Sequence, residues 1–284
     1  MMERVRWDEL PSDLRAAITA RAGEVTSAHV VPEGLHCTAA LKLRTERESL
    51  FLKGVRLTDG PGLAGLKFEQ EINGILTGVC PPINFQVEAA GWYCLAFAYI
   101  DGRHADFTPG TEDLPSITLT LRRMGTLRNL RTPVESLAGK FKGFLSPAEA
   151  ELLTGSCLLH MDSNPHNVLV TPRRAHFVDW ARAALGPAWV DPVYMATWLM
   201  TYGCPPGDAL KWLSNFTSWR QADPRAVEAF VAASCRQWTD QVGEADAKER
   251  NERFTRLLGF PHEWSLGSGS LQGVPLASHR IDRS

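Results

Sequence analysis

The chain has 284 residues, of which 44% are hydrophobic and 22% charged, a composition typical of a globular protein with one large domain or two lobes. A formal net charge of −2 gives no electrostatic basis for binding nucleic acid or an anionic membrane surface. The first residues lack the apolar core of a signal peptide and no later run is long enough to span a membrane, so we expect a cytoplasmic protein. Six cysteines are scattered without a C-x-x-C pair, which indicates reduced thiols rather than a metal or disulfide framework.

The first part of the chain, residues 1–100, is predicted to form a small lobe around an antiparallel sheet. Apolar runs bounded by turn residues predict strands at residues 25–31, 38–43, 49–52, 85–88 and 92–100. Helical spacing predicts helices at residues 8–22 and 67–76, the second one after a glycine-rich loop at Gly60, Gly62 and Gly65.

Lys53 lies inside the apolar run around the third expected strand. A lysine there must pair with another group or lose its solvation, and a nucleotide phosphate together with a helix glutamate would satisfy it. The alternative is a lysine that extends from the strand end into solvent. Glu69 and Glu71 both lie at the border of the apolar face of the next helix, so helix geometry does not choose between them. We take Glu71 as the partner, the alternative being a solvated acidic flank.

Residues 101–115 are rich in glycine, proline and aspartate and mark a hinge and linker between two lobes. Beyond them, residues 116–260 are expected to form a mainly helical lobe. Spacing and capping residues predict helices at residues 114–127, 134–144, 146–153, 193–202, 208–219, 224–242 and 245–258. Residues 261–284 have neither periodicity nor apolar density, so we expect a loose tail.

The residues suited to catalysis follow an apolar run near the middle of the chain. This run leads to His160, Asp162 and Asn167, and a second apolar strand ends at Asp179. Phosphoryl transfer from ATP needs a carboxylate beside the acceptor hydroxyl and further ligands that hold metal on the phosphates. Asp162 fits the first role, and the side-chain oxygens of the other two suit magnesium. The spacing H-x-D-x-x-x-x-N, with a later aspartate, matches the catalytic loop and metal segment of protein kinases. The pattern therefore predicts a phosphoryl-transfer enzyme.

From about residue 25 to residue 200, this order of elements and motifs resembles the aminoglycoside phosphotransferase and choline kinase family. The resemblance implies an α+β, bilobal protein-kinase-like fold. The N-lobe would be a small antiparallel sheet with one helix, and the C-lobe would be mainly helical. Residues 91–92, 102–106 and 109–110 narrow the resemblance to a group common in actinomycete bacteria.

The resemblance implies a role for each residue of the catalytic motif. Asp162 would orient or deprotonate the acceptor hydroxyl, and His160 would brace the catalytic loop rather than react. Asn167 and Asp179 would bind magnesium. The segment after Asp179 reads Trp-Ala and lacks the glycine of D-F-G, so we do not expect the switching of regulated protein kinases.

The same resemblance implies that the small lobe binds the nucleotide, ATP or GTP. Lys53, held by Glu71, would contact the α and β phosphates. The strand at residues 92–100 would run into the hinge, where backbone atoms of Ala98 and Ile100 would pair with the base.

Two departures from the family pattern are evident. The turn at residues 31–36 is poor in glycine, so it would cover the phosphates less closely than a protein-kinase loop does. Ser163 stands where an apolar residue often follows the catalytic aspartate. Neither departure removes an essential group.

Two functions other than phosphotransfer would also use parts of this pattern. A hydrolase with zinc bound by His160, Asp162 and His166 would suit the ligand types. That interpretation leaves Lys53, Asn167 and Asp179 without a role. A nucleotide-binding pseudokinase or interaction module would be expected to lack a base, lysine or metal ligand, and this sequence has all three.

The acceptor is not determined by the sequence. A choline-like alcohol, a sugar, homoserine, a protein side chain, and an aminoglycoside or another antibiotic all stay open. An aminoglycoside is a polycation and favours an acidic pocket, yet acidic and basic residues are nearly balanced between residues 208 and 263. Asp106, Glu112, Asp113 and Asp191 could converge on the cleft, although Asp191 could equally cap a helix. A small hydroxyl compound is the acceptor we expect.

Overall fold

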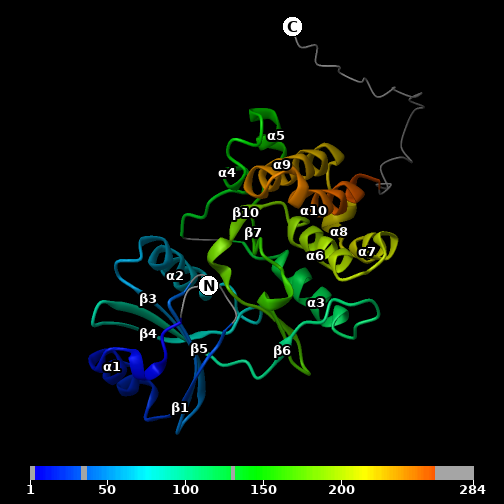
Figure 1. Ribbon diagram of the computed structural model, residues 1–284. Helices are drawn as coiled ribbons and strands as arrows, with labels where there is room; N and C mark the ends of the chain where they lie inside the picture. Colours follow the sequence, from blue (N-terminus) through cyan, green and yellow to red (C-terminus); the bar gives the residue numbers. More distant parts are fainter. Residues whose placement is uncertain (1–3, 33–36, 129–131, 260–284) are drawn as a thin grey trace, which may run out of the picture.

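The computed structural model describes residues 4–32, 37–128 and 132–259, which form two lobes side by side (Figure 1). The blue and cyan residues build a lobe around a sheet, and the green to orange residues build a mainly helical lobe. Part of the predicted turn at residues 31–36, and the whole predicted tail at residues 261–284, lie outside the described residues.

The N-lobe contains the predicted five-stranded antiparallel sheet, with strand order β1-β2-β3-β5-β4. The strands are β1 (Val25–Val30), β2 (Ala39–Thr45), β3 (Ser49–Arg56), β4 (Ile83–Ala89) and β5 (Trp92–Ala98). The predicted third strand ended at residue 52, but β3 continues because Lys53 and Gly54 pair with Leu95 and Cys94 of β5.

Alternation along β3 places its side chains on two different faces of the sheet. Leu50 and Leu52 are fully buried on the face covered by α1 (Ser12–Ala22), in one cluster with Leu14 and Ile18. Each such leucine stabilises the lobe by roughly 1.5–3 kcal/mol. Lys53 consequently lies on the opposite face, toward the helix α2 (Gly60–Asn73).

The start of α2 differs from the prediction, because the expected glycine-rich loop is the first half of the helix. Asp59 caps the helix: its carboxylate accepts a hydrogen bond from the N–H of Gly62 at 3.0 Å. A cap of this kind contributes about 1 kcal/mol, which offsets the low helix propensity of one glycine. The helix also ends earlier than predicted, at Asn73 rather than residue 76.

The C-lobe consists mainly of helices, in agreement with the prediction. They are α3 (Leu114–Met124), α4 (Leu137–Lys140), α5 (Pro147–Leu152), α6 (Val190–Thr201), α7 (Pro206–Leu213), α8 (Thr217–Arg220), α9 (Pro224–Val242) and α10 (Glu244–Arg256). The predicted bounds of α9 and the predicted capping box at Ser146 are confirmed.

Two predicted C-lobe helices are shorter than expected. The helix predicted at residues 134–144 is reduced to α4, and Gly143 adopts a left-handed conformation shortly after it, with φ of 88°. The helix predicted at residues 208–219 is divided into α7 and α8. Between them, Ser214 and Asn215 donate side-chain hydrogen bonds to the helix carbonyls of Lys211 and Trp212, which competes with helix continuation.

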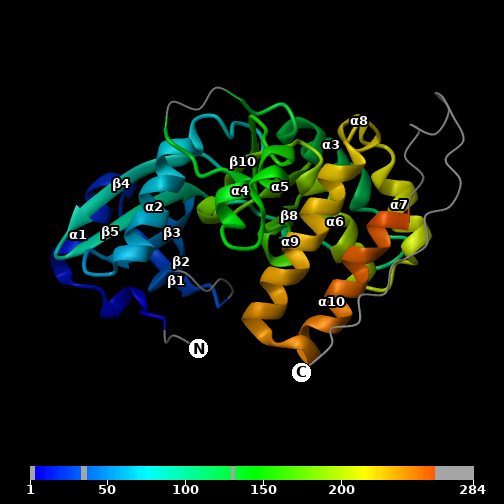
Figure 2. The same cartoon turned by 90° about the horizontal axis from the view of Figure 1, so that it is seen from above.

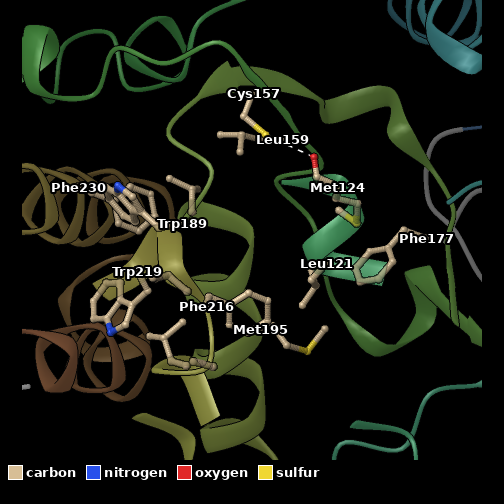
Figure 3. Packing of buried hydrophobic residues seen from close by; sticks show 14 of the residues in the cluster. Leu121, Met124, Cys157, Leu159, Phe177, Trp189, Met195, Phe216, Trp219 and Phe230 are labelled. Carbon is tan, nitrogen blue, oxygen red and sulfur yellow. Dashed lines mark hydrogen bonds between the residues drawn. The ribbon is translucent and has the colours of Figure 1, made fainter. Parts of the chain in front are cut away.

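The core of the C-lobe is aromatic (Figure 3). Trp189 packs edge to face against Phe230 of α9, with ring centroids 5.3 Å apart, and also lies against Trp219. The Cys157 thiol is buried in the same core and contacts the Met124 carbonyl at 3.4 Å. Within the described part of the chain, no helix combines the length and apolar character that crossing a membrane requires.

Two small sheets hold the loops between the helices. In one, β7 (Cys157–Leu159) pairs with β10 (Ala184–Gly186); in the other, β8 (Val168–Val170) lies between β6 (Arg103–His104) and β9 (Ala175–Phe177). The predicted catalytic loop runs from β7 to β8, and the predicted metal segment follows β9. The two antiparallel pairs therefore fix both segments side by side.

Candidate active site

A buried lysine joins the two lobes at the centre of the site. Lys53 Nζ lies 2.8 Å from Glu69 Oε1 and 3.1 Å from Asp179 Oδ1. The side chain of Lys53 is only 12% exposed, that of Glu69 5% and that of Asp179 21%. The predicted pairing of Lys53 with Glu71 is therefore wrong, and Glu69 takes that place.

The choice of glutamate follows from where α2 begins. Leu66, Glu69 and Ile72 are the buried residues of this helix and recur every three positions, so they share one face. Glu71 is exposed on another face. The spacing of Leu66, Glu69 and Ile72 is visible in the sequence. A helix predicted to start at residue 67 omits Leu66, so both glutamates were placed at the border of its apolar face.

The three charged groups control one another's protonation. Burial alone favours the neutral amine, but the carboxylates of Glu69 and Asp179 outweigh it and raise the pKa of Lys53 above its ordinary value. The positive charge of Lys53 lowers the pKa of Asp179 to about 2, in spite of burial. Burial raises the pKa of Glu69 to about 7, against the attraction of Lys53. A cationic lysine beside an ionised aspartate is the result.

His160 connects the catalytic loop to the metal segment. It is fully buried, its Nε2 lies 2.9 Å from the Val178 carbonyl, and its Nδ1 accepts the N–H of Asp162 at 3.2 Å. These two partners assign the ring proton to Nε2, which donates to Val178. Both ring nitrogens of His160 thus have backbone partners, as expected of a residue that braces the loop. Neither nitrogen is left to bind zinc, so the zinc-site alternative does not fit.

The backbone is strained at the two points that His160 connects. Met161 and Asp179 adopt left-handed conformations, with φ of 68° and 65°. Such conformations cost of order 1–3 kcal/mol each for residues other than glycine and persist where the surrounding structure enforces them. The strain therefore falls on the predicted catalytic loop and on the predicted metal ligand.

Two asparagines hold Asp162. Asn167 Nδ2 donates to the Asp162 backbone carbonyl at 3.0 Å, and Asn164 Nδ2 donates to the Asp162 carboxylate at 2.8 Å. Asn164 was not singled out from the sequence, because its position two residues after the aspartate carries no motif signal. The pair keeps the carboxylate in place, and Asn164 engages one of its two oxygens.

The sequence left open whether Asp191 lines the cleft or caps a helix. Its carboxylate is buried and accepts the backbone N–H groups of His160 at 2.8 Å and Met161 at 3.0 Å. Burial raises its pKa, although His160 and the two hydrogen bonds act against this effect. Asp191 therefore anchors the catalytic loop and does not line an acidic acceptor pocket.

Asn167 and Asp179 offer the oxygen ligands that magnesium prefers. The Asn167 amide nitrogen is engaged with Asp162, so its remaining side-chain atom is the oxygen. The N–H of Val178 donates to the Asn167 carbonyl at 2.9 Å, which joins the two segments. Within the described ranges, no three His, Cys, Asp or Glu side chains converge in a way that could hold a metal ion.

The segment predicted to contact the base leaves the sheet at the end of β5. Ala98 donates its N–H to the Pro82 carbonyl at 2.9 Å, which leaves its carbonyl oxygen as the atom that could bind a base. Ile100 lies beyond the last sheet residue. Phe97, just before Ala98, is buried with its ring centroid 5.8 Å from Lys53 Nζ. The strand therefore leads from the lysine toward the predicted hinge.

Comparison with known proteins supports the predicted fold. Residues 118–239 match the profile described as "Phosphotransferase enzyme family". A thermostable mutant of aminoglycoside phosphotransferase APH(4)-Ia, in ternary complex with AMP-PNP and hygromycin B, is 13% identical and gives a TM-score of 0.61 over 88% of this chain and 98% of that one.

Other solved structures share the same fold. Choline kinase LicA from Streptococcus pneumoniae is 13% identical, with a TM-score of 0.54 over 85% of this chain and 96% of that one. Macrolide 2'-phosphotransferase MphH from Brachybacterium faecium is 16% identical, with a TM-score of 0.53 over 87% and 98%. No curated protein matches the sequence. The predicted resemblance is confirmed: the part of the chain that carries the catalytic motif matches the phosphotransferase profile, and the chain has the kinase-like fold seen in aminoglycoside phosphotransferases and choline kinases.

Proposed function

We propose that this protein transfers the γ-phosphoryl group of ATP or GTP to a hydroxyl of a small molecule. One observation carries the proposal: Lys53 of the sheet lobe bonds to both Glu69 and Asp179, and Asp179 lies next to the loop that holds Asp162. A lysine, a metal-binding oxygen set and a fixed carboxylate are the parts that phosphoryl transfer needs at one place.

Asp162 is the group that acts on the acceptor. Its carboxylate would accept the proton of the acceptor hydroxyl as the hydroxyl oxygen bonds to the γ phosphorus and the bond between that phosphorus and the leaving diphosphate breaks. Asn164 holds one carboxylate oxygen at 2.8 Å, so the other would be the one that accepts the proton. Positioning of this kind accounts for most of the catalysis in this class of reaction.

Lys53 and the metal ligands act on the nucleotide. Lys53 would contact the α and β phosphates, with Glu69 keeping the ammonium in place. Asn167 and Asp179 would hold magnesium, which neutralises charge on the phosphates during transfer. The backbone of Ala98 and Ile100 would bind the base.

The neighbouring structures support a small acceptor. One neighbour was solved with hygromycin B, and others are a macrolide 2'-phosphotransferase and a choline kinase. We propose a hydroxylated small molecule for this chain too, an aminoglycoside or another antibiotic among the candidates, rather than a nucleic acid or a membrane lipid. A phosphotransferase that uses ATP and magnesium would find both in the cytoplasm, and we propose that location for this protein.

The test is consumption of ATP and of GTP by the purified protein in the presence of magnesium. The acceptor panel comprises aminoglycosides, macrolides, choline, sugars and homoserine, and Asp162→Asn is assayed alongside. Consumption that requires one acceptor class and Asp162 is the expected result. Nucleotide binding with no transfer to any acceptor would favour the pseudokinase alternative, and transfer by Asp162→Asn at the parent rate would refute the mechanism.

A further inference from the structure

A second set of polar contacts, besides the bond between Glu69 and Lys53, joins α2 to the sheet. The Tyr93 hydroxyl on β5 lies 2.9 Å from Gln86 Oε1 on β4 and also bonds to Gln70 Oε1 on α2. The Gln70 amide in turn donates to Gln86 Oε1, so each of these three side chains contacts the other two. A helix and two strands therefore meet at one hydroxyl.

These contacts lie on the side of the sheet that carries Lys53. On the paired strands β3 and β5, Tyr93 lies opposite Val55, two residues beyond Lys53. Because side chains two residues apart on a strand share a face, Tyr93 and Lys53 point to the same side of the sheet. α2 packs on this side, opposite to α1 (Figure 2), and its Leu66 belongs to the same buried cluster as Val55 and Tyr93. Tyr93 is only 3% exposed, so its ring lies within the interface between helix and sheet.

Gln70, which bonds to the Tyr93 hydroxyl, is the neighbour of Glu69 in α2. The two side chains point about 100° apart around the helix axis. Gln70 therefore reaches β4 and β5, whereas Glu69 reaches Lys53 of β3. A rotation of α2 that broke the Gln70 contacts would also turn the Glu69 carboxylate away from Lys53, because both side chains belong to the same turn of helix.

The end of α2 has an anchor of its own. The Asn73 amide donates to the Pro81 carbonyl at 3.0 Å, and its side-chain oxygen accepts the N–H of Ile83 at 3.0 Å. A helix held at one end can still pivot about that point. The Gln70 contacts, one turn before Asn73, remove this freedom in the turn that carries Glu69.

The lysine exchanges a partner when it performs its proposed role. Its ammonium bonds to both Glu69 and Asp179, but in the proposed function Asp179 binds magnesium and Lys53 binds the phosphates. Glu69 is then the residue that keeps Lys53 in place, and its own place depends on α2. We propose that Tyr93 is a positioning residue: through Gln70, its hydroxyl holds α2 in the rotation at which Glu69 reaches Lys53, and so sets the affinity for the nucleotide.

The role of Tyr93 rests on the proposed function, because it matters only if Lys53 binds the nucleotide. The competing explanation is that Tyr93 serves packing alone: its ring fills the interface between helix and sheet, and Lys67 Nζ lies 5.6 Å from the ring centroid. Phenylalanine keeps this packing and loses only the hydroxyl. The two explanations therefore predict different nucleotide affinities for Tyr93→Phe.

The kinetic test compares Tyr93→Phe with the parent and with the control Tyr202→Phe, whose hydroxyl belongs to an exposed residue of the C-lobe. We expect the KM for ATP to rise about fivefold in Tyr93→Phe, the effect of losing one hydrogen bond of ordinary net strength. The KM for the acceptor should stay unchanged, and Tyr202→Phe should match the parent in both constants. A KM for ATP in Tyr93→Phe equal to that of the parent would overturn the inference, whatever happens to the midpoint of thermal unfolding.

A double variant shows whether Tyr93 acts through Glu69. We expect Tyr93→Phe to change the KM for ATP by less than about twofold once Glu69→Gln is present, because the contact that it positions has already lost its charge. Independent effects would instead multiply in the double variant. That result would also overturn the inference.

A binding measurement separates this inference from the proposed function. A non-hydrolysable ATP analogue with magnesium is titrated into the same variants by calorimetry, and we expect its Kd to follow the pattern of the KM for ATP. If no acceptor is phosphorylated but the Kd depends on Tyr93 through Glu69, the role of Tyr93 stands and the proposed transfer fails. If transfer occurs but Tyr93→Phe binds the analogue as tightly as the parent, the role of Tyr93 fails and the proposed function stands. A parent that does not bind the analogue would contradict both.

Discussion

Asp191 and His160 are bound to each other although they are 31 residues apart in the chain: the buried Asp191 carboxylate accepts the His160 backbone N–H at 2.8 Å. Its other oxygen accepts the N–H of Met161, which has a left-handed backbone. The carboxylate thus stabilises the strained start of the catalytic loop, upstream of Asp162.

Asp191→Asn is therefore expected to damage both stability and transfer. The amide can accept one of the two N–H groups but turns an N–H of its own toward the other, which leaves a buried donor unsatisfied at a cost of about 1–3 kcal/mol. We expect a fall of that size in the free energy of unfolding in urea, together with a lower kcat. A variant as stable and as active as the parent would show that the loop holds its conformation without Asp191.

Glu69 and Glu71 provide a matched pair on one helix. Glu69→Gln keeps the shape but removes the charge that holds Lys53, and a hydrogen bond to a charged group is worth about 1.5–3 kcal/mol. We expect kcat/KM for ATP to fall by roughly tenfold or more, since about 1.4 kcal/mol corresponds to one factor of ten.

Glu71→Gln is the control for that experiment, because Glu71 is exposed and is not the partner of Lys53. We expect its kcat/KM for ATP to stay within about twofold of the parent, as surface substitutions usually change little. Equal losses in the two variants would mean that net charge on α2, and not the contact with Lys53, sets nucleotide affinity.

How far the sequence predicted the site depended on how local each contact is. The order His160, Asp162, Asn167 along one loop is a local spacing, and the five strands follow from short apolar runs with turn residues between them. The partner of Lys53 was not predicted correctly, because the register of α2 depends on a cap at Asp59 that lies before three glycines.

The anchoring of the loop by Asp191 could not be predicted for a different reason. Nothing in the local pattern distinguishes a buried aspartate that binds two backbone N–H groups from one that caps its own helix. The contact joins α6 to the loop that follows β7, so it depends on tertiary packing and not on the local sequence.

Gly155 is expected to be intolerant of any side chain. A Cβ atom there would lie 2.1 Å from the backbone carbon of Gly186 and 2.4 Å from the nitrogen of Pro187, and backbone atoms cannot rotate away. We expect Gly155→Ala to lower the free energy of unfolding by about 1–3 kcal/mol, as overpacking does.

Gly207, in α7 with open space around it, is the control. Gly207→Ala should be neutral or stabilising by up to about 1 kcal/mol. Urea unfolding of both variants measures the difference, and similar values for the two would show that the chain at Gly155 can move aside.

The capping box of α5 predicts a specific pH dependence. The Ser146 backbone N–H donates to Glu149 at 2.7 Å, and this hydrogen bond, with those from the Ser146 hydroxyl and Arg236, lowers the pKa of Glu149 to about 2. Its unfolded pKa is near 4.5, so the native state holds fewer protons than the unfolded state between these values. The contribution of Glu149 to stability is therefore complete above pH 4.5 and is lost as the pH falls toward 2.

Glu149→Gln tests this dependence because the amide keeps an oxygen for the Ser146 N–H but cannot ionise. At pH 7 we expect the variant to be less stable by up to about 1 kcal/mol, the usual size of a capping contribution. Between pH 4.5 and 2 the parent should lose stability faster than the variant, so that the two unfolding curves converge. A difference that stays constant down to pH 2 would show that the carboxylate charge contributes nothing and that the capping interaction depends on the hydrogen bonds alone.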